Sequence, residues 1–199
     1  RWQLLQACRL IEKKGLHTTL EAFAQILAQY PHAHLTVAGD GPLQPALEKH
    51  AASLGITHST HFTGFANQTE LRKLVYASHL FFHPSQTGSD GNREGVPNAM
   101  LEAMATAMPV LTTRHGGIPE AVTHRSSGLL CDEKDAASLA ANALEVIASP
   151  RLYKSLATGA RQAVTDHFGR ANQTVALENI YRLAIDHTLR CGTIDQSDQ

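Results

Sequence analysis

Short apolar runs of strand-like composition alternate along this chain with longer segments of helical periodicity. The strand-like runs lie at Leu4–Cys8, Leu35–Ala38, Thr60–Phe62, Leu80–Phe82, Pro109–Leu111 and Gly128–Cys131. From Leu16 to Leu27 the large apolar residues recur at steps of four, three and four, which places them on one stripe of a helix. Strands separated by single helices cannot pair as hairpins, so the alternation favours a parallel sheet covered on both faces. With right-handed crossovers, this predicts an α/β fold with a Rossmann-like doubly wound sheet of about six strands.

After the last strand-like run the pattern becomes helical. Apolar residues from Leu139 to Ile147 form one stripe, and those from Leu177 to Ile185 form another on the last long helix. No internal repeat and no low-complexity linker divides the sequence. We therefore expect one domain over residues 1–190 with trailing C-terminal helices, followed by a frayed polar tail at 191–199.

Charge and cysteine content exclude several classes of protein. The 17 Lys and Arg against 18 Asp and Glu leave a net charge of −1, which argues against a nucleic-acid binder with a general basic field. No apolar run has the roughly 18 residues that a membrane span requires. Cys8, Cys131 and Cys191 lie far apart and outside any CxxC pair, so neither a disulfide framework nor a cysteine zinc site is expected. A reducing cytoplasm is the natural setting.

Function in an open α/β sheet is expected beyond the carboxyl ends of its strands. Glycine, basic and polar residues follow the predicted strands there. The segments concerned are Arg9, Gly39–Gly41, Gly64–Phe65, Pro84–Val96 and Thr113–Gly117. Each is weak evidence alone, because Gly39–Gly41 is also typical of a tight turn and Gly116–Gly117 of a turn into a helix.

One of these segments predicts an anion site. Pro97 suits the first position of a helix, and the amides of Asn98 to Met100 would then be free donors at its positive end. Gly95 removes a side chain where a ligand would approach the backbone closely. Glu94 and Glu102 would repel a phosphate, so they make better sense as acceptors for hydroxyl groups. Amides for phosphate beside acceptors for hydroxyls describe a sugar-nucleotide site.

The first strand-end loop offers complementary positive charge. The fork of Arg9 could grip a diphosphate and Lys14 could add a compact charge. The alternative is that Lys13 and Lys14 form a solvated pair on a loop. Both interpretations stay open on the sequence alone.

Several other binding and catalytic motifs are absent from the sequence. No GxGxxG follows the first strand, and neither a P-loop nor a GxSxG elbow is present. Twelve histidines raise the question of a metal, but His79 and His83 flank a strand-like run, where a spacing of four holds their Cβ atoms about 13 Å apart. Surface or edge histidines are the favoured interpretation. His115 is the exception, because it lies in the fifth strand-end loop beside Gly116.

Taken in order, the motifs resemble the C-terminal domain of glycosyltransferase family 4, bacterial exopolysaccharide and colanic-acid type. The resemblance runs from about Arg9 to Leu130 and is carried by Arg9-Leu10-x-x-Lys13-Lys14-Gly15, Ala38-Gly39-Asp40-Gly41-Pro42-Leu43, Phe62-x-Gly64-Phe65, Pro84-Ser85, Glu94-Gly95-Val96-Pro97-x-x-x-Leu101-Glu102-Ala103-Met104-Ala105, Pro109-Val110 and Gly116-Gly117-Ile118-Pro119-Glu120. The family implies one half of a GT-B fold and a retaining hexosyltransferase.

The resemblance also implies roles for individual residues. Arg9, Lys14 and Glu94 would be catalytic, the first two at the donor diphosphate and Glu94 at the donor sugar. Donor-binding positions would be Gly64, Phe65, Gly95, Val96, Pro97, Leu101, Glu102, His115 and Gly116. The family implies a nucleotide-diphospho-sugar as substrate, with no cofactor and no metal ion, in agreement with the lack of a metal-ligand cluster in the sequence. Cys8 and Ala107 stand where the family usually has glycine.

The same resemblance implies a partner outside this sequence. A GT-B enzyme has an N-terminal acceptor domain, and the chain begins inside an apolar run without a methionine. We expect that absent domain to bind a saccharide or lipid-linked acceptor and to make any peripheral contact with the cytoplasmic face of a membrane. The isolated fragment is expected to be inactive. The alternatives are a non-catalytic sugar-nucleotide-binding module and a GT-B epimerase or phosphorylase relative.

Overall fold

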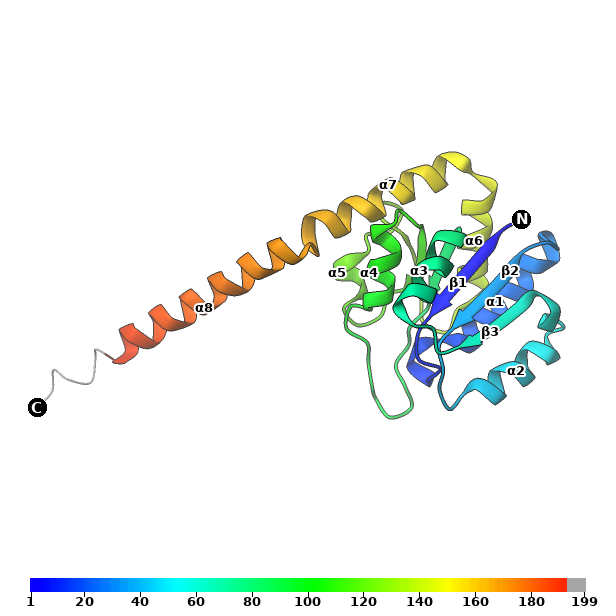
Figure 1. Ribbon diagram of the computed structural model, residues 1–199, viewed down its shortest axis with the longest axis horizontal. Helices are drawn as coiled ribbons and strands as arrows, with labels where there is room; N and C mark the ends of the chain where they lie inside the picture. The colour runs from blue at the N-terminus through cyan, green and yellow to red at the C-terminus, as the bar shows by residue number, and fades with distance from the viewer. Residues whose placement is uncertain (193–199) are drawn as a thin grey trace, which may run out of the picture. The chain divides into compact units, whose positions relative to one another are not determined.

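The structure, a computed structural model, describes residues 1–192, and side chains as far as residue 188 (Figure 1). It divides into two compact units, Arg1–Val164 and the segment from Thr165 onward. The first unit contains a six-stranded sheet. Its strands are β1 (Gln3–Ala7), β2 (His34–Ala38), β3 (Thr60–Gly64), β4 (Leu80–His83), β5 (Val110–Thr113) and β6 (Leu129–Cys131). All six predicted strands are confirmed, with ends that differ by one or two residues.

The strands are parallel and lie in the order β3-β2-β1-β4-β5-β6. The chain order reverses at the β1/β4 pair, which is where a ligand of a doubly wound sheet binds. This confirms the predicted Rossmann-like architecture. On this topology, a site is expected at the carboxyl edge of the sheet near β1.

Helices cover both faces of the sheet (Figure 1). In the first unit the helices are η1 (Glu12–Lys14), α1 (Leu16–Gln29), α2 (Gln44–Ser53), η2 (Thr57–Ser59), α3 (Gln68–Ala77), α4 (Asn98–Ala105), α5 (Ile118–Ala121) and α6 (Ala136–Ala148). Helix α7 (Pro150–His167) runs across the boundary between the two units, and α8 (Arg170–Gly192) belongs to the second. The predicted stripes on α1 and α6 face the core, where Leu16, Leu20 and Leu139 are almost fully buried. The two helices pack against each other over one face of the sheet.

The central strands are buried on both faces. Leu4, Leu5, Phe81, Phe82 and Leu111 have no exposed surface, as expected for parallel strands that run between two layers of helices. A rigid platform of this kind holds its strand-end loops at fixed positions. The loops beyond β1, β2, β3, β4 and β5 carry most of the candidate functional residues.

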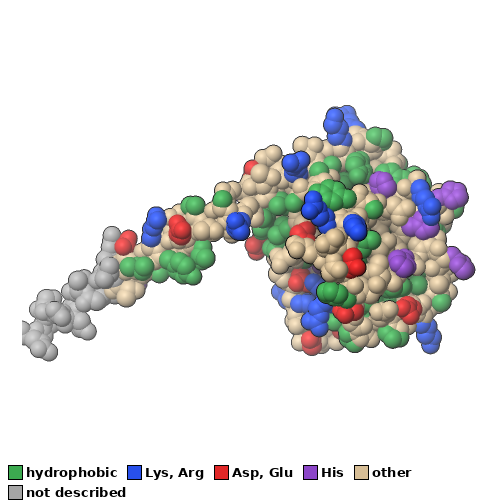
Figure 2. All heavy atoms as spheres, viewed as in Figure 1, with side chains coloured by type: hydrophobic (Ala, Val, Ile, Leu, Met, Phe, Trp, Pro, Cys, Tyr) green, Lys and Arg blue, Asp and Glu red, His purple; other side chains and the backbone are tan. Residues whose placement is uncertain are grey.

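Helix α8 presents a different surface. Its apolar residues are exposed, among them Leu177, Ile180 and Tyr181 of the stripe that the periodicity predicts. Figure 2 shows hydrophobic side chains along this helix. Most of the predicted tail, residues 193–199, lies outside the described residues. Within residues 1–192, no helix is both long and apolar enough to cross a bilayer.

Candidate functional site

A cleft of about 390 Å³ opens at the carboxyl ends of β1 and β2. It is lined by Ala7, Cys8, Arg9, Ala38, Gly39, Asp40, Phe65, Ala66, Leu71 and Ala99. The lining therefore combines three strand-end loops with the first turn of α4 and one residue of α3. Arg9, Gly39, Asp40 and Phe65, from segments singled out in the sequence, all line this cleft.

The walls of the cleft suit a flat, partly apolar ligand. The ring of Phe65 is 74% exposed although it lines the cleft, so one face of it is free for stacking. Cys8 is packed so closely that burial raises the pKa of its thiol to about 12, despite the opposing charge of Lys14. The thiol is therefore neutral, and the lining residues with charged side chains are Arg9 and Asp40.

Lys14 reaches the edge of the sheet through the short helix η1 and a glycine. Gly15 follows η1 in the left-handed region at φ +63°, and a Cβ there would lie 1.8 Å from the carbonyl oxygen of Pro84. Only glycine allows the two loops to approach so closely. The buried Gln6 side chain donates to the Lys14 carbonyl at 2.8 Å and fixes the end of η1.

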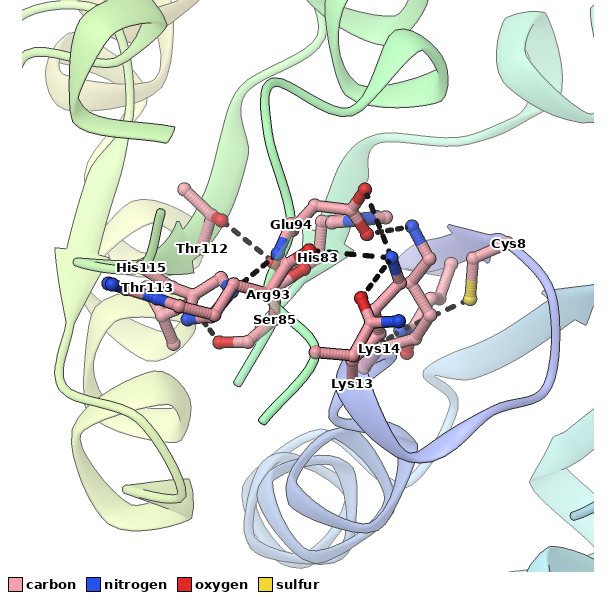
Figure 3. A network of polar contacts seen from close by, with 12 residues as sticks. Cys8, Lys13, Lys14, His83, Ser85, Arg93, Glu94, Thr112, Thr113 and His115 are labelled. Carbon is pink, nitrogen blue, oxygen red and sulfur yellow. Dashed lines mark hydrogen bonds and ion pairs between the residues drawn. The ribbon is translucent and has the colours of Figure 1, made fainter. Parts of the chain in front are cut away.

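The ammonium of Lys14 forms an ion pair with the carboxylate of Glu94, on the loop beyond β4 (Figure 3). The two side chains are only 13% and 14% exposed. Charges in this setting are weakly screened, so the pair is a strong electrostatic contact. The structure therefore brings together the two residues, 80 positions apart, that the family resemblance names for the diphosphate and the sugar.

Lys13 also approaches this carboxylate, with its Nζ 4.0 Å from Glu94 Oε1, and it holds the neighbouring loop as well. Its Nζ donates to Asn92 Oδ1 at 3.1 Å and lies 3.5 Å from the carbonyl oxygen of Arg93. The neighbouring Glu12 accepts hydrogen bonds from the backbone N–H and the hydroxyl of Ser89. Instead of a solvated lysine pair, η1 thus holds the long loop between β4 and α4 in place, and Lys14 points inward from the same turn.

Helix α4 begins where an anion site is predicted, one residue later than expected. Pro97 is the N-cap at φ −70° and ψ 122°, and the helix starts at Asn98. The amides of Met100 and Leu101 donate to the Pro97 carbonyl at 3.1 and 3.2 Å. Within the described residues, the free donors of this first turn are therefore Asn98 and Ala99, a narrower cradle than the predicted Asn98–Met100.

Glu102 lies on a different surface from Glu94. It lines a second cavity of about 250 Å³ between α3 and α4, together with Gln68, Arg72, Tyr76 and Thr106. Leu71 lines both this cavity and the first cleft, so the two adjoin. The two glutamates serve neighbouring regions rather than one pocket.

His115 is buried beneath the Glu94 loop and has no exposed side-chain surface. Its Nε2 accepts the backbone N–H of Glu94 at 2.9 Å, and its Nδ1 lies 2.6 Å from Glu133 Oε1. The next residue, Gly116, has φ +51°, and a Cβ on it would stand 1.9 Å from the Glu94 carbonyl oxygen. Both residues therefore support the backbone of Glu94 rather than face the open edge. Glu133 was not identified from the sequence, where it stands in a polar turn after β6.

His83 is a second buried histidine, and here the expectation of a surface or edge position is wrong. It is 1% exposed at the end of β4, its ring stacks on Phe81, and neither ring nitrogen has a hydrogen-bond partner among the described residues. Burial, with the charge of Lys14, lowers its pKa to about 3. His83 is therefore a neutral, buried side chain close to Lys14. The β-strand period alone gave no sign of this, because β4 is buried on both faces.

No metal centre forms among the described residues: no three His, Cys, Asp or Glu side chains gather closely enough to hold an ion. Histidine side chains do collect on one part of the surface in Figure 2. Elsewhere a histidine has a simple structural contact: His79 Nδ1 accepts the Gln3 N–H at 3.0 Å.

Comparison with known proteins agrees with this geometry. Residues 1–163 match the family described as glycosyl transferases, group 1. The chain is 36% identical over 169 residues to WcaL of Salmonella typhimurium, named as a colanic acid biosynthesis glycosyltransferase. It is 34% identical over 178 residues to AmsK of Erwinia amylovora, an amylovoran biosynthesis glycosyltransferase. These matches cover 84% and 89% of this chain but only 42% and 43% of the relatives, so the chain spans less than half their length.

Solved structures show the same fold. The C-terminal domain of the group 1 glycosyl transferase LpcC from Francisella tularensis superposes with a TM-score of 0.75 at 23% identity, covering 85% of this chain and 87% of that domain. Anabaena HepE, solved in complex with UDP and glucose, gives a TM-score of 0.79 at 25% identity over 89% of this chain and 48% of its own.

Proposed function

Because the chain belongs to the glycosyl transferases group 1 family, we propose that it is the donor-binding domain of a retaining hexosyltransferase. It holds a nucleotide-diphospho-sugar and supports transfer of the sugar to a saccharide or lipid-linked acceptor in polysaccharide biosynthesis. The observation that carries the proposal is the Lys14–Glu94 ion pair beside the cleft that Arg9 and Phe65 line. The names of WcaL and AmsK support the polysaccharide setting.

The nucleotide occupies the cleft beyond β1 and β2 in this proposal. The base lies near Gly64 and stacks on Phe65, and the ribose hydroxyls reach Glu102 through the adjoining cavity. The diphosphate lies between Arg9 and Lys14 on one side and the first turn of α4 on the other. Gly95, Val96 and Leu101 border that path. UDP is a reasonable first ligand, because the similar HepE structure holds UDP and glucose.

Positive charge at the leaving group comes from side chains. Arg9 offers a planar fork and Lys14 a point charge, and the free amides of α4 add the positive end of the helix. Together they stabilise the diphosphate as its bond to the sugar breaks, so we propose that the reaction needs no metal ion and no other cofactor.

Glu94 changes partners during the cycle. Before the donor binds, its carboxylate neutralises Lys14. When the diphosphate takes over Lys14, the carboxylate is released to accept hydrogen bonds from hydroxyls of the donor sugar. The exchange keeps both charges partnered, which avoids leaving a bare charge in a weakly hydrated site.

In the transfer itself, the bond between the anomeric carbon and the β-phosphate oxygen breaks, and the acceptor oxygen bonds to the same face of that carbon. Because the new bond forms on the face from which the diphosphate leaves, the anomeric configuration is retained, and the acceptor proton passes to the departing diphosphate. The acceptor is held by a separate N-terminal domain in this proposal. We place the enzyme in the cytoplasm, with any attachment to the cytoplasmic membrane face through that other domain.

Two experiments test the proposal. Calorimetry of the 199-residue chain with UDP, GDP and ADP should reveal binding of one of them, without sugar transfer by the chain alone. In the whole enzyme, Arg9→Ala and Lys14→Ala should each lower the turnover rate by about 10²–10³ because a charge contact to the leaving phosphate is lost. Arg151→Ala and Lys154→Ala, exposed on α7, are the matched controls. Normal turnover in both site variants refutes the assignment, and NMR of the product tests retention.

A further inference from the structure

We propose that Glu133 and His115 form a positioning pair that holds the backbone of Glu94 and thereby sets the preference for a nucleotide-sugar over the free nucleotide. This inference rests on the proposed function and assigns two residues to the control of its sugar contact. Glu133 touches neither the cleft nor Lys14. It acts through His115.

The direction of each hydrogen bond follows from the backbone. The amide of Glu94 can only donate, so His115 Nε2 must accept and carries no proton. The ring proton therefore sits on Nδ1, from which it is donated to Glu133 Oε1 at 2.6 Å. Without that carboxylate, only the single hydrogen bond from the Glu94 amide favours this tautomer in this set of contacts.

The opposite side of the same residue is also held. The Glu94 carbonyl lies against Gly116, where a Cβ would be 1.9 Å away, and accepts the Gly117 amide at 3.4 Å. The three consecutive residues His115, Gly116 and Gly117 thus contact both the N–H and the carbonyl group of Glu94. Since the backbone is held, the side chain of Glu94 can turn from Lys14 to a ligand without moving its Cα.

Glu133 reaches the start of the same loop as well. Its Oε2 accepts the Thr87 amide at 2.8 Å, and its Oε1 lies 3.4 Å from the Thr87 hydroxyl. Burial tends to raise the pKa of Glu133, but the hydrogen bonds from Thr87 and His115 outweigh it and lower the pKa overall. The carboxylate is therefore charged at neutral pH. One side chain anchors both ends of the segment from Thr87 to Glu94.

Loss of the pair should affect the sugar more than the nucleotide. Arg9, Phe65 and the α4 amides are positioned by other elements, so they keep their hold on a nucleoside diphosphate. Glu94 loses its fixed backbone and meets the sugar hydroxyls less often. We expect Glu133→Ala to weaken binding of the nucleotide-sugar roughly tenfold, the effect of one charge-assisted hydrogen bond, and to change the Kd of the nucleoside diphosphate less than about twofold.

The first measurement needs no ligand. Nitrogen-15 NMR of the His115 ring in the 199-residue chain should show protonated Nδ1 and unprotonated Nε2 in the wild type. Glu133→Gln retains an acceptor oxygen and should keep this tautomer, whereas Glu133→Ala should give a mixture. Glu145→Gln removes a carboxylate that pairs with exposed Arg125 and is the control. An unchanged tautomer in Glu133→Ala overturns the proposal.

The second measurement is calorimetry with UDP and UDP-glucose, or with GDP and GDP-mannose if GDP is the preferred base. The ratio of the two Kd values should fall roughly tenfold in Glu133→Ala and recover in Glu133→Gln. Thr112→Val, which removes a buried hydrogen bond to the His83 carbonyl, should lower stability without changing the ratio. Equal weakening of both ligands indicates a merely structural role and overturns the proposal. If the wild type binds neither ligand, the proposed function fails, and the tautomer measurement alone decides the pair.

Discussion

Replacing Glu94 by glutamine should make the domain bind a nucleoside diphosphate more tightly, although Glu94 belongs to the site. In the free protein its carboxylate occupies Lys14, which the diphosphate must recruit. A glutamine side chain has nearly the same shape without the charge. The substitution releases Lys14 and also removes a negative charge that would repel the phosphates.

The size of the gain follows from the burial of the pair. Two unit charges about 4 Å apart interact by about 4 kcal/mol at an effective dielectric constant of about 20. Both side chains retain some exposure, 13% and 14%, and glutamine keeps a weaker hydrogen bond to the ammonium. Allowing for both, we expect about 1–2 kcal/mol, which corresponds to a Kd for UDP roughly 5 to 30 times lower.

Calorimetry with UDP and UDP-glucose separates the two effects of this substitution. UDP should bind more tightly, whereas UDP-glucose should gain less because the sugar loses a charged acceptor. Glu145→Gln, in an exposed ion pair with Arg125, is the charge-matched control and should leave both Kd values unchanged. If Glu94→Gln binds UDP no more tightly than the wild type, the ion pair does not compete with the phosphate, and the partner exchange proposed for Glu94 is refuted.

Three further predictions concern stability and association. The pKa of His83 is about 3 in the folded chain and 6.5 in the unfolded chain, so protonation stabilises the unfolded state as the pH falls below 6.5. In urea denaturation, the free energy of unfolding should therefore fall between about pH 7 and 5 by about 2 kcal/mol more in the wild type than in His83→Phe. Equal losses would contradict the buried neutral ring. Gly116→Ala should cost about 3 kcal/mol in the same assay and abolish the nucleotide-sugar preference, whereas Gly55→Ala, at φ +70° with open space around it, should cost only about 1 kcal/mol. Ile180→Lys with Leu183→Lys should reduce self-association of the chain in sedimentation velocity, because these side chains are 60% and 70% exposed; a monomeric wild type would count against this.

The parts of the fold that depend on local periodicity could be predicted from the sequence. Alternation of strand-like and helical segments was sufficient for six parallel strands, because each crossover helix excludes a hairpin. Strand ends then placed Arg9 and Phe65 at one edge, and the structure brings them to one cleft. The stripe on α1 could be recognised for the same reason, since one face of a helix on a sheet must be apolar.

Contacts between distant segments could not be predicted. Nothing near Lys14 in the sequence indicates that its partner is Glu94. The role of Glu133 depends on the side chain of His115, which follows β5 and lies between Glu133 and the Glu94 backbone. His115 was singled out for its position but was assigned to the ligand instead of the backbone. The burial of His83 depends on layers that cover both faces of β4, which a polar residue at a strand end does not reveal.

The position of Glu133 also has a consequence for the order in which the protein matures during synthesis. The contacts that hold the backbone of Glu94 need His115, Gly116 and Glu133 in the turn after β6. They therefore cannot all form on a nascent chain that ends before Glu133. At about 5–20 residues per second, the ribosome adds the intervening residues in roughly two to eight seconds. Over that interval β1 to β4 are already made, while the backbone of Glu94 still lacks the residues that hold it.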